Sequence, residues 1–169
     1  DTSFRFVEGE TRTNLKVVDP VNHTNTDINE PGVTVSGEIL DGYLKELLLK
    51  VNAGDIVVIS GSLPTGSPKD TYQTWVKAFK EAGAKVILDA DGALLAGGIE
   101  SSPYLIKPNN HELSGLLGRK LDTTDKLEEA ARELMAKYGI SKIVVSMGGD
   151  GALYVTEKES VYAEGLKVP

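Results

Sequence analysis

Between residues 55 and 146, four short runs rich in Val, Ile and Leu alternate with segments of helical periodicity. Strands that are joined by helices run parallel in one sheet, and such sheets normally carry helices on both faces. We therefore predict an α/β fold with a mostly parallel central sheet that is covered on both sides. The four runs are residues 55–60, 85–89, 104–106 and 142–146.

The segments between these runs carry recognisable helix ends. Thr123 or Thr124 is expected to cap an amphipathic helix that Gly139 ends. Ser67 is expected to cap another helix, with Pro68 at its first position. A further helix, capped by Thr34 or Ser36, is expected to reach Val51. Helices are also expected over residues 90–97 and 109–117, and a terminal hairpin over 152–155 and 160–163.

The first 30 residues differ from the rest because they contain strand patterns and no helical one. Short strands are expected over residues 4–7, 11–18 and 24–29, which together form a small antiparallel sheet. Such a sheet is too small to be stable alone. We therefore divide the chain into a β lid over residues 1–30 and a partial α/β core over residues 31–169.

Composition narrows the classes of function. The 169 residues carry a net charge of −7 and no cysteine, which argues against a nucleic-acid surface and excludes disulfides and thiolate metal sites. No stretch approaches the roughly 18 apolar residues that cross a bilayer, so we expect no membrane association. The absence of cysteine fits the cytoplasmic location that we expect. The chain starts at Asp1 and stops just after a strand pattern, so we expect it to be a piece of a longer protein.

The unusual residues follow the four expected strands directly. In a parallel sheet every strand ends at the same edge, and open α/β sheets bind their ligands there. Four loops rich in glycine or charge at one edge therefore predict a single ligand-binding crevice. These loops are residues 61–66, 89–92, 107–112 and 148–151.

Each loop also has a plain structural interpretation. The first and last can be simple turns, and Asp89 can be the N-cap of the next helix. Asn109 or Asn110 can cap a helix with Glu112 in its first turn, but a cap does not need the preceding Lys107. A lysine at a strand end beside a helix N-terminus suits a phosphate that carries a hydrated divalent cation.

Taken together, these segments resemble the ribokinase-like carbohydrate kinases, in particular the branch that acts on hexose phosphates. The order and spacing of the matching residues agree over essentially the whole chain. They are residues 11–14, 26–29, 60–66, Asp89, residues 107–109 with Glu112 and Leu113, and residues 146–152.

The resemblance implies a three-layer α/β sandwich with a small antiparallel β lid, of which this chain holds a truncated part. In such kinases the lid covers the sugar site and commonly joins two subunits, so a homodimer through the lid is implied. Arg12 is expected to reach the sugar phosphate from the lid, since a guanidinium binds phosphate in a bidentate way. Ser62 is expected to bind the sugar or its phosphate.

The resemblance also implies ATP and Mg²⁺ as cofactors. It assigns Lys107, Asn109 and Glu112 to the Mg-ATP phosphates, with Glu112 reaching the metal through water. Asp89 is expected to support the site from the end of its strand. Ser146, Gly148 and Gly151 are expected to pass close to the nucleotide, where larger side chains clash.

The implied activity of the parent protein is ATP-dependent phosphorylation of fructose 1-phosphate to fructose 1,6-bisphosphate. Phosphorylation of tagatose 6-phosphate and a non-catalytic sugar-phosphate or nucleotide-binding module are the alternatives. The family's catalytic Asp, in a Gly-Ala-Gly-Asp segment, is expected beyond Pro169, and Asp150 does not replace it because it precedes a strand. We therefore expect no catalytic base and no kinase activity in residues 1–169.

Overall fold

The computed structural model describes residues 2–166, which fall into two compact units. The first contains residues 2–45 and 63–68, and the second contains residues 46–62 and 69–166. The expected division at residue 30 stays a prediction.

The first unit contains a two-stranded antiparallel hairpin of β1 (Asn14–Asp19) and β2 (Thr24–Asn29). Asp19 closes its turn, because the Asp19 carboxylate accepts hydrogen bonds from the backbone N–H groups of Val21 and Asn22. The expected strand over residues 4–7 is wrong, since these residues pair with no other strand.

One face of this hairpin is apolar and exposed. Leu15 and Val17 lie on that face, and Leu15 stands opposite Ile28 in the register. The other face carries an ion pair between Lys16 and Asp27, with 3.4 Å between nitrogen and oxygen. Leu15 and Val17 therefore lie together on an exposed apolar face of the hairpin.

The helix α1 (Gly37–Leu48) follows the hairpin in the chain. Ser36 precedes it, and the Ser36 hydroxyl accepts a hydrogen bond from Ile39 N–H at 3.4 Å, as expected for a cap. The helix ends at Leu48, before the expected Val51, and the chain turns there through the bond from Lys50 N–H to the Leu47 carbonyl.

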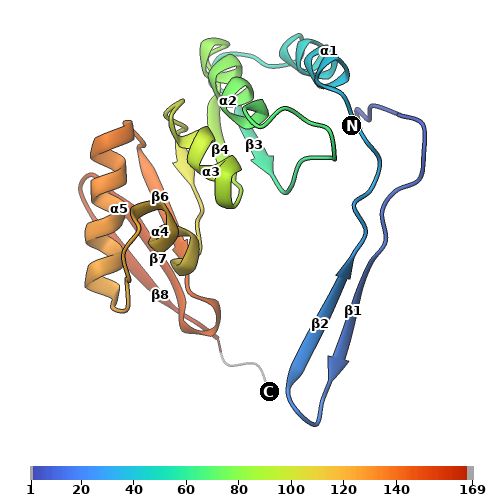
Figure 1. Ribbon diagram of the computed structural model, residues 1–169. Coiled ribbons are helices and arrows are strands. Elements are labelled where there is room, and N and C mark those ends of the chain that lie inside the picture. The colour runs from blue at the N-terminus through green and yellow to red at the C-terminus, as the bar shows by residue number, and fades with distance from the viewer. Residues whose placement is uncertain (1, 167–169) are drawn as a thin grey trace. The chain divides into compact units, whose positions relative to one another are not determined.

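The second unit is a six-stranded sheet in the order β3-β4-β5-β6-β7-β8 (Figure 1). The first four strands are parallel, and β7 and β8 add an antiparallel hairpin. The strands are β3 (Ile56–Ser60), β4 (Lys85–Asp89), β5 (Leu105–Ile106), β6 (Lys142–Ser146), β7 (Gly151–Thr156) and β8 (Ser160–Glu164). The mostly parallel sheet and the terminal hairpin are therefore confirmed.

Four helices connect or follow these strands in chain order: α2 (Thr71–Glu81), α3 (Gly92–Ile99), α4 (Asn110–Leu117) and α5 (Thr124–Tyr138). The start of α2 differs from the expectation, because Ser67 N–H donates to the Pro64 carbonyl and the chain turns before helix formation begins. Asp70 is the N-cap residue of α2. Thr123 and Gly139 delimit α5 as expected.

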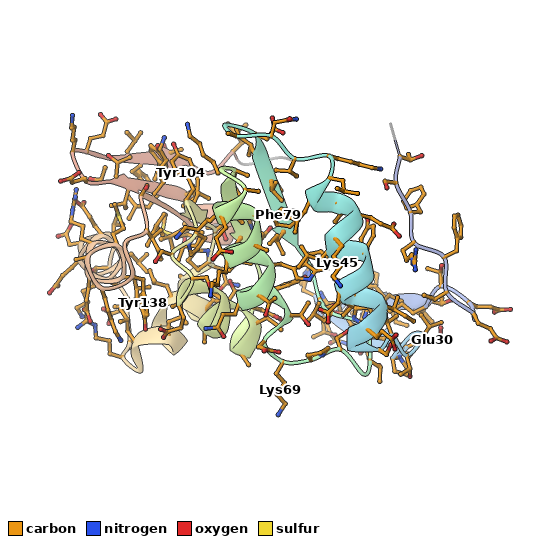
Figure 2. All side chains as sticks on the ribbon, turned by 90° about the horizontal axis from the view of Figure 1, so that it is seen from above. Glu30, Lys45, Lys69, Phe79, Tyr104 and Tyr138 are labelled. Atoms are coloured by element: carbon orange, nitrogen blue, oxygen red, sulfur yellow. The ribbon has the colours of Figure 1, made fainter. Side chains whose placement is uncertain are left out.

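The helices α2 to α5 lie on one face of the sheet (Figures 1 and 2). Consecutive strand order with right-handed crossovers places every connecting helix on the same side. The residues that face the helices form the core, and Phe79 lies on the sheet side of α2 (Figure 2). That core includes Val76, Phe79, Val86, Leu88, Leu113, Leu134, Ile143 and Val145.

The opposite face of the sheet carries no helix of this unit, so within this unit the sheet is covered on one side only. The expected cover on both sides stays a prediction. Ile56 and Val58 of the edge strand β3 are 63% and 61% exposed, although they alternate with the buried Ile59. Val and Ile on both faces of a strand indicate that both faces need cover, but they do not say which segment provides it.

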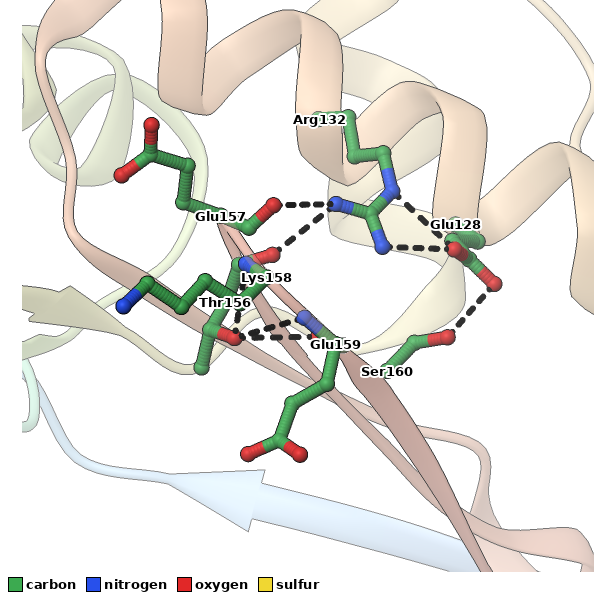
Figure 3. A network of polar contacts seen from close by, with 7 residues as sticks. All are labelled: Glu128, Arg132, Thr156, Glu157, Lys158, Glu159 and Ser160. Atoms are coloured by element: carbon green, nitrogen blue, oxygen red, sulfur yellow. Dashed lines mark hydrogen bonds and ion pairs between the residues drawn. The ribbon is translucent and has the colours of Figure 1, made fainter.

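A polar network fixes the turn of the β7–β8 hairpin to α5 (Figure 3). The Arg132 guanidinium donates to the Glu128 carboxylate at 2.8 Å and to the Thr156 carbonyl at 2.9 Å. The same carboxylate accepts a bond from the Ser160 hydroxyl at 2.8 Å. The hairpin is therefore held at its turn as well as by its pairing with β6.

Candidate active site

The loops after β3, β4, β5 and β6 meet at one edge of the sheet, as the sequence predicts. Hydrogen bonds join each loop to its neighbour at that edge. Gly61 N–H donates to the Asp89 carbonyl at 3.1 Å, and Ser146 N–H donates to the Pro108 carbonyl at 3.0 Å. Between them, Lys107 N–H donates to the Leu88 carbonyl at 3.1 Å. Ser62, Asp89, Lys107 and Gly148 therefore belong to one edge of one sheet.

A hollow of about 270 Å³ opens at this edge. It brings together three of the residues expected at the site, Ser62, Asp89 and Glu112. The full lining is Ser60, Gly61, Ser62, Asp89, Ala90, Asp91 and Glu112. The wall is therefore acidic, with hydroxyl groups on the β3 side.

Lys107 supplies a positive charge beside this wall. Its ammonium nitrogen lies 3.2 Å from a carboxylate oxygen of Asp89, and both side chains remain partly exposed, at 45% and 37%. An exposed ion pair of this kind contributes little to stability because water solvates both partners. A phosphate can therefore replace Asp89 as the partner of Lys107 at small cost.

Asn109 and Glu112 form a capping box at the start of α4. The Asn109 side-chain oxygen accepts hydrogen bonds from His111 N–H at 2.9 Å and from Glu112 N–H at 2.8 Å. In return, the Glu112 carboxylate accepts from Asn109 N–H at 2.8 Å. Both residues thus have a structural role, and Glu112 in addition lines the hollow.

The donor set at this edge fits magnesium bound to a phosphate chain. Magnesium prefers oxygen ligands and keeps several waters when phosphates bind it, so it needs few direct protein ligands. Asp89 and Glu112 offer carboxylate oxygens, and Lys107 together with the positive end of the α4 dipole suits phosphate. Within residues 2–166, no group of three or more His, Cys, Asp or Glu side chains could hold a metal by itself.

Glycine occupies positions 148 and 151, after β6, for two different physical reasons. Gly148 begins a short 3₁₀ helix, Gly148–Asp150, with φ +59°, and a Cβ there would meet open space. Gly151 has φ +105°, and a Cβ there would overlap the Ala163 carbonyl of β8. Gly151 is therefore required by strand packing, whereas Gly148 leaves room for a ligand.

Arg12 lies in the first unit, in the segment that precedes β1. Its side chain runs along Gly32, because a Cβ at Gly32 would lie 3.4 Å from Arg12 Cβ and 3.5 Å from Arg12 Cδ. The expectation that Arg12 reaches the sugar phosphate stays a prediction.

Sequence reasoning missed two side chains near the hollow. Asp91 lines it and precedes α3 as its N-cap residue, but the Asp91 side chain makes no capping hydrogen bond. Tyr72 of α2 donates its hydroxyl to the Gly61 carbonyl at 3.0 Å. Burial raises the pKa of Tyr72, and the negative charge of Asp91 raises it further. The Asp-Ala-Asp-Gly sequence could have revealed Asp91, but no local pattern reveals Tyr72.

The sequence is similar to bacterial enzymes named 1-phosphofructokinase. The relative from Xanthomonas campestris is 40% identical over 161 residues, which cover 93% of this chain and 50% of the relative. The relative from Bacillus subtilis is 37% identical over 162 residues, which cover 96% of this chain and 52% of the relative. The chain thus spans about half the length of the relatives that it matches.

The structure is similar to solved phosphofructokinases. Phosphofructokinase-2 from Escherichia coli, in complex with potassium, matches with a TM-score of 0.83 and 30% identity over 94% of this chain and 52% of its own. A possible 1-phosphofructokinase from Thermotoga maritima matches with a TM-score of 0.73 and 32% identity over 91% of this chain and 48% of its own.

These likenesses confirm the expected fold class. The family model for the pfkB family carbohydrate kinases matches residues 1–168. The chain belongs to the pfkB family of carbohydrate kinases.

Proposed function

We propose that the full-length protein that carries this chain transfers the γ-phosphoryl group of ATP to fructose 1-phosphate and forms fructose 1,6-bisphosphate. The observation that carries the proposal is the meeting of the four loops at one sheet edge, where Lys107 stands beside an acidic hollow. The choice of sugar rests on the relatives, which are named 1-phosphofructokinase at 32–40% identity in the first five matches.

The proposed roles follow from charge and position. Phosphoryl transfer depends mainly on alignment of the reactants and on stabilisation of the charge on the moving group. Lys107 and the N-terminus of α4 would hold the ATP phosphates, and the Glu112 carboxylate would orient metal-bound water. Magnesium, when bound to those phosphates, supplies further positive charge. Lys107 would pair with the phosphate in place of Asp89, and the Asp89 carboxylate would accept hydrogen bonds from the metal-bound water.

The proposed sugar side of the site begins with Ser62. Its position after β3, beside Ser60 and Gly61, offers hydroxyl and backbone donors to a sugar or its phosphate. Ser146 and Gly148 would lie against the nucleotide, where the open space at Gly148 admits it. Gly151 would contribute by fixing the loop, because its packing against β8 already requires glycine.

The hairpin of β1 and β2 is proposed as a lid that carries Arg12 to the sugar phosphate. Its exposed face of Leu15, Val17 and Ile28 supports a homodimer through the lid, since an apolar face of this kind needs a partner. One structure similar to this chain is the tetrameric inhibited form of phosphofructokinase-2 from Escherichia coli. The expected cytoplasmic location stays a prediction.

We also propose that the base acting on the acceptor hydroxyl comes from outside residues 1–169. If this is wrong, Asp89 and Asp150 are the candidates for the base within this chain, and Asp91, which lines the hollow, is a third. A coupled assay of ADP release with fructose 1-phosphate and Mg-ATP compares the 169-residue chain with the full-length protein. Loss of an anion hole and of a general base together reduce rates by about 10⁴-fold or more, so the chain alone should show no turnover. Turnover near that of the full-length protein would place the base within this chain.

A panel of sugar phosphates tests the substrate. The full-length protein should show its highest kcat/KM with fructose 1-phosphate, compared with fructose 6-phosphate and tagatose 6-phosphate. Fructose 6-phosphate belongs in the panel because a similar solved structure is a phosphofructokinase-2 bound to that sugar. A higher kcat/KM for either competitor would refute the proposed substrate, and binding without turnover would favour the non-catalytic module.

A further inference from the structure

Tyr72 is the second residue of α2, and its side chain is only 5% exposed. A buried phenol normally finds a hydrogen-bond partner for its hydroxyl, because an unpaired one loses its interaction with water. The partner here is the Gly61 carbonyl, with 3.0 Å between the oxygens. The bond therefore ties the start of α2 to the loop that follows β3.

Both backbone polar groups of Gly61 form hydrogen bonds. Its N–H donates to the Asp89 carbonyl at 3.1 Å, and its carbonyl accepts from Tyr72. Its φ of +96° lies in the region that favours glycine. Because C=O and N–H point in opposite directions across a trans peptide bond, the bond to Tyr72 also sets the direction of Ser62 N–H.

We infer that Tyr72 is a positioning residue that fixes the Gly61–Ser62 peptide, and through it the sugar-phosphate side of the site. This inference rests on the function proposed above. Tyr72 acts through the peptide and is not assigned any contact with substrate. A site must hold its binding groups within about 0.5 Å of the productive geometry, so loss of one fixing bond is expected to weaken binding.

The Tyr72 hydroxyl is protonated at neutral pH. Burial raises the pKa of Tyr72 above its ordinary value of 10.0, and the charge of Asp91 raises it further. The group that donates to Gly61 is therefore present throughout the neutral and mildly alkaline range.

Tyr162 of β8 provides a comparison at a second loop, although its side chain is 50% exposed. Its hydroxyl donates to the Asp150 carbonyl at 2.6 Å, in the loop between Gly148 and Gly151 that is proposed to lie against the nucleotide. Both tyrosines thus hold one loop carbonyl at the same sheet edge. They differ in the loop that they hold, so their loss should affect different substrates.

The experiment compares Tyr72→Phe and Tyr162→Phe in the full-length enzyme. Each change removes one hydroxyl and keeps the ring. Tyr72→Phe should raise KM for fructose 1-phosphate by about fivefold or more and change KM for Mg-ATP less than about twofold. Tyr162→Phe should give the reverse. Equilibrium titrations with each ligand should show the same selectivity in dissociation constants.

A purely structural role for Tyr72 predicts a different outcome. It would lower the melting temperature and affect both substrates equally or neither, and either result overturns the inference. Should Tyr72→Phe fail to fold, Gly61→Ala tests the same peptide. A Cβ at Gly61 meets no atom within 4 Å, but the φ of +96° strains alanine and should shift the peptide. The same selective loss of sugar-phosphate binding is expected.

Failure of the proposed function can be told apart from failure of this inference. A wild-type enzyme without turnover of fructose 1-phosphate refutes the proposed substrate. The comparison of the two tyrosines is then made with the sugar phosphate that the wild type prefers in the panel. A loss of affinity in Tyr72→Phe that is confined to that sugar phosphate supports the positioning role. A loss that also affects Mg-ATP equally, or no loss, overturns it.

Discussion

Gly98 of α3 offers a sharp test of packing beneath the site. The helix α3 begins directly after Asp91 and packs against α2 and β4. A Cβ at Gly98 would overlap Cδ2 of Leu88, and the Leu88 side chain is fully buried. Alanine in place of glycine stabilises a helix by about 0.5–1 kcal/mol, but overpacking of a core costs about 1–3 kcal/mol. Because Leu88 has no solvent side to move toward, the packing term prevails. We expect Gly98→Ala to lower the free energy of unfolding by about 1–2 kcal/mol.

Gly97 in the same helix is the matched control. A Cβ at Gly97 meets no atom within 4 Å, so Gly97→Ala keeps only the gain in helix propensity, about 0.5–1 kcal/mol. Urea denaturation followed by far-UV circular dichroism measures both variants against the wild type. The two substitutions are chemically identical, so their difference isolates the contact with Leu88. A Gly98→Ala variant as stable as Gly97→Ala would refute the packing argument, since the core would then have room to shift.

Three further changes test other parts of the chain. Arg12→Ala should weaken fructose 1-phosphate binding to the full-length enzyme by about 1.5–3 kcal/mol, as for a lost charge-assisted hydrogen bond, and leave Mg-ATP titrations unchanged. Equal losses for both ligands would show that Arg12 does not act on the sugar. Lys107→Met should lower kcat by about 10²-fold or more at an unchanged melting temperature, and a wild-type kcat would remove Lys107 from the phosphate site. Hydrogen bonds from Arg132 and then Ser160 lower the pKa of Glu128 below 4.5, so the carboxylate contributes stability above that pH and loses it as the pH falls through the folded-state pKa. The stability difference between wild type and Glu128→Gln should therefore be constant near neutral pH and vanish in acid, and a difference that grows in acid contradicts this.

The strands of the six-stranded sheet could be predicted from the sequence, whereas the strand expected over residues 4–7 could not. Residues 85–89 and 142–146 are strands over the expected ranges, because their Val and Ile content and the flanking glycines and charges leave few other choices. The position of the helices α2 to α5 on one face of the sheet could not be predicted in this way. The pattern states which side chains need burial, whereas strand order and crossover handedness decide where the helices go.

The sequence predicts those site residues that lie at the ends of paired strands. Asp89 ends β4 and Lys107 follows the neighbouring strand β5, so the parallel register alone brings them together. The bond between Tyr72 and Gly61 joins residues 11 positions apart across a turn, and its formation depends on the tilt of α2. Glu112 shows a further limit, because the same residue satisfies a capping box and lines the hollow. Sequence alone leaves these two roles open.

Asn109 carries the same ambiguity, and its amide makes the two roles separable. The capping box uses the side-chain oxygen, which accepts from His111 N–H and Glu112 N–H. The proposed contact with phosphate needs a donor, which only the amide nitrogen can provide. Asn109→Asp keeps a capping oxygen and adds a charge that favours a helix N-terminus.

The Asn109→Asp variant should therefore match the wild type in melting temperature. Its KM for Mg-ATP should rise by about tenfold or more, because a carboxylate replaces the donor and repels the phosphates. Asn109→Ala is the comparison, since it removes both roles and the lost cap costs about 1 kcal/mol of stability. An Asn109→Asp enzyme with wild-type KM for Mg-ATP would show that Asn109 serves only to cap α4. Lys107 would then be the only side chain of this loop that is proposed to contact the phosphates directly.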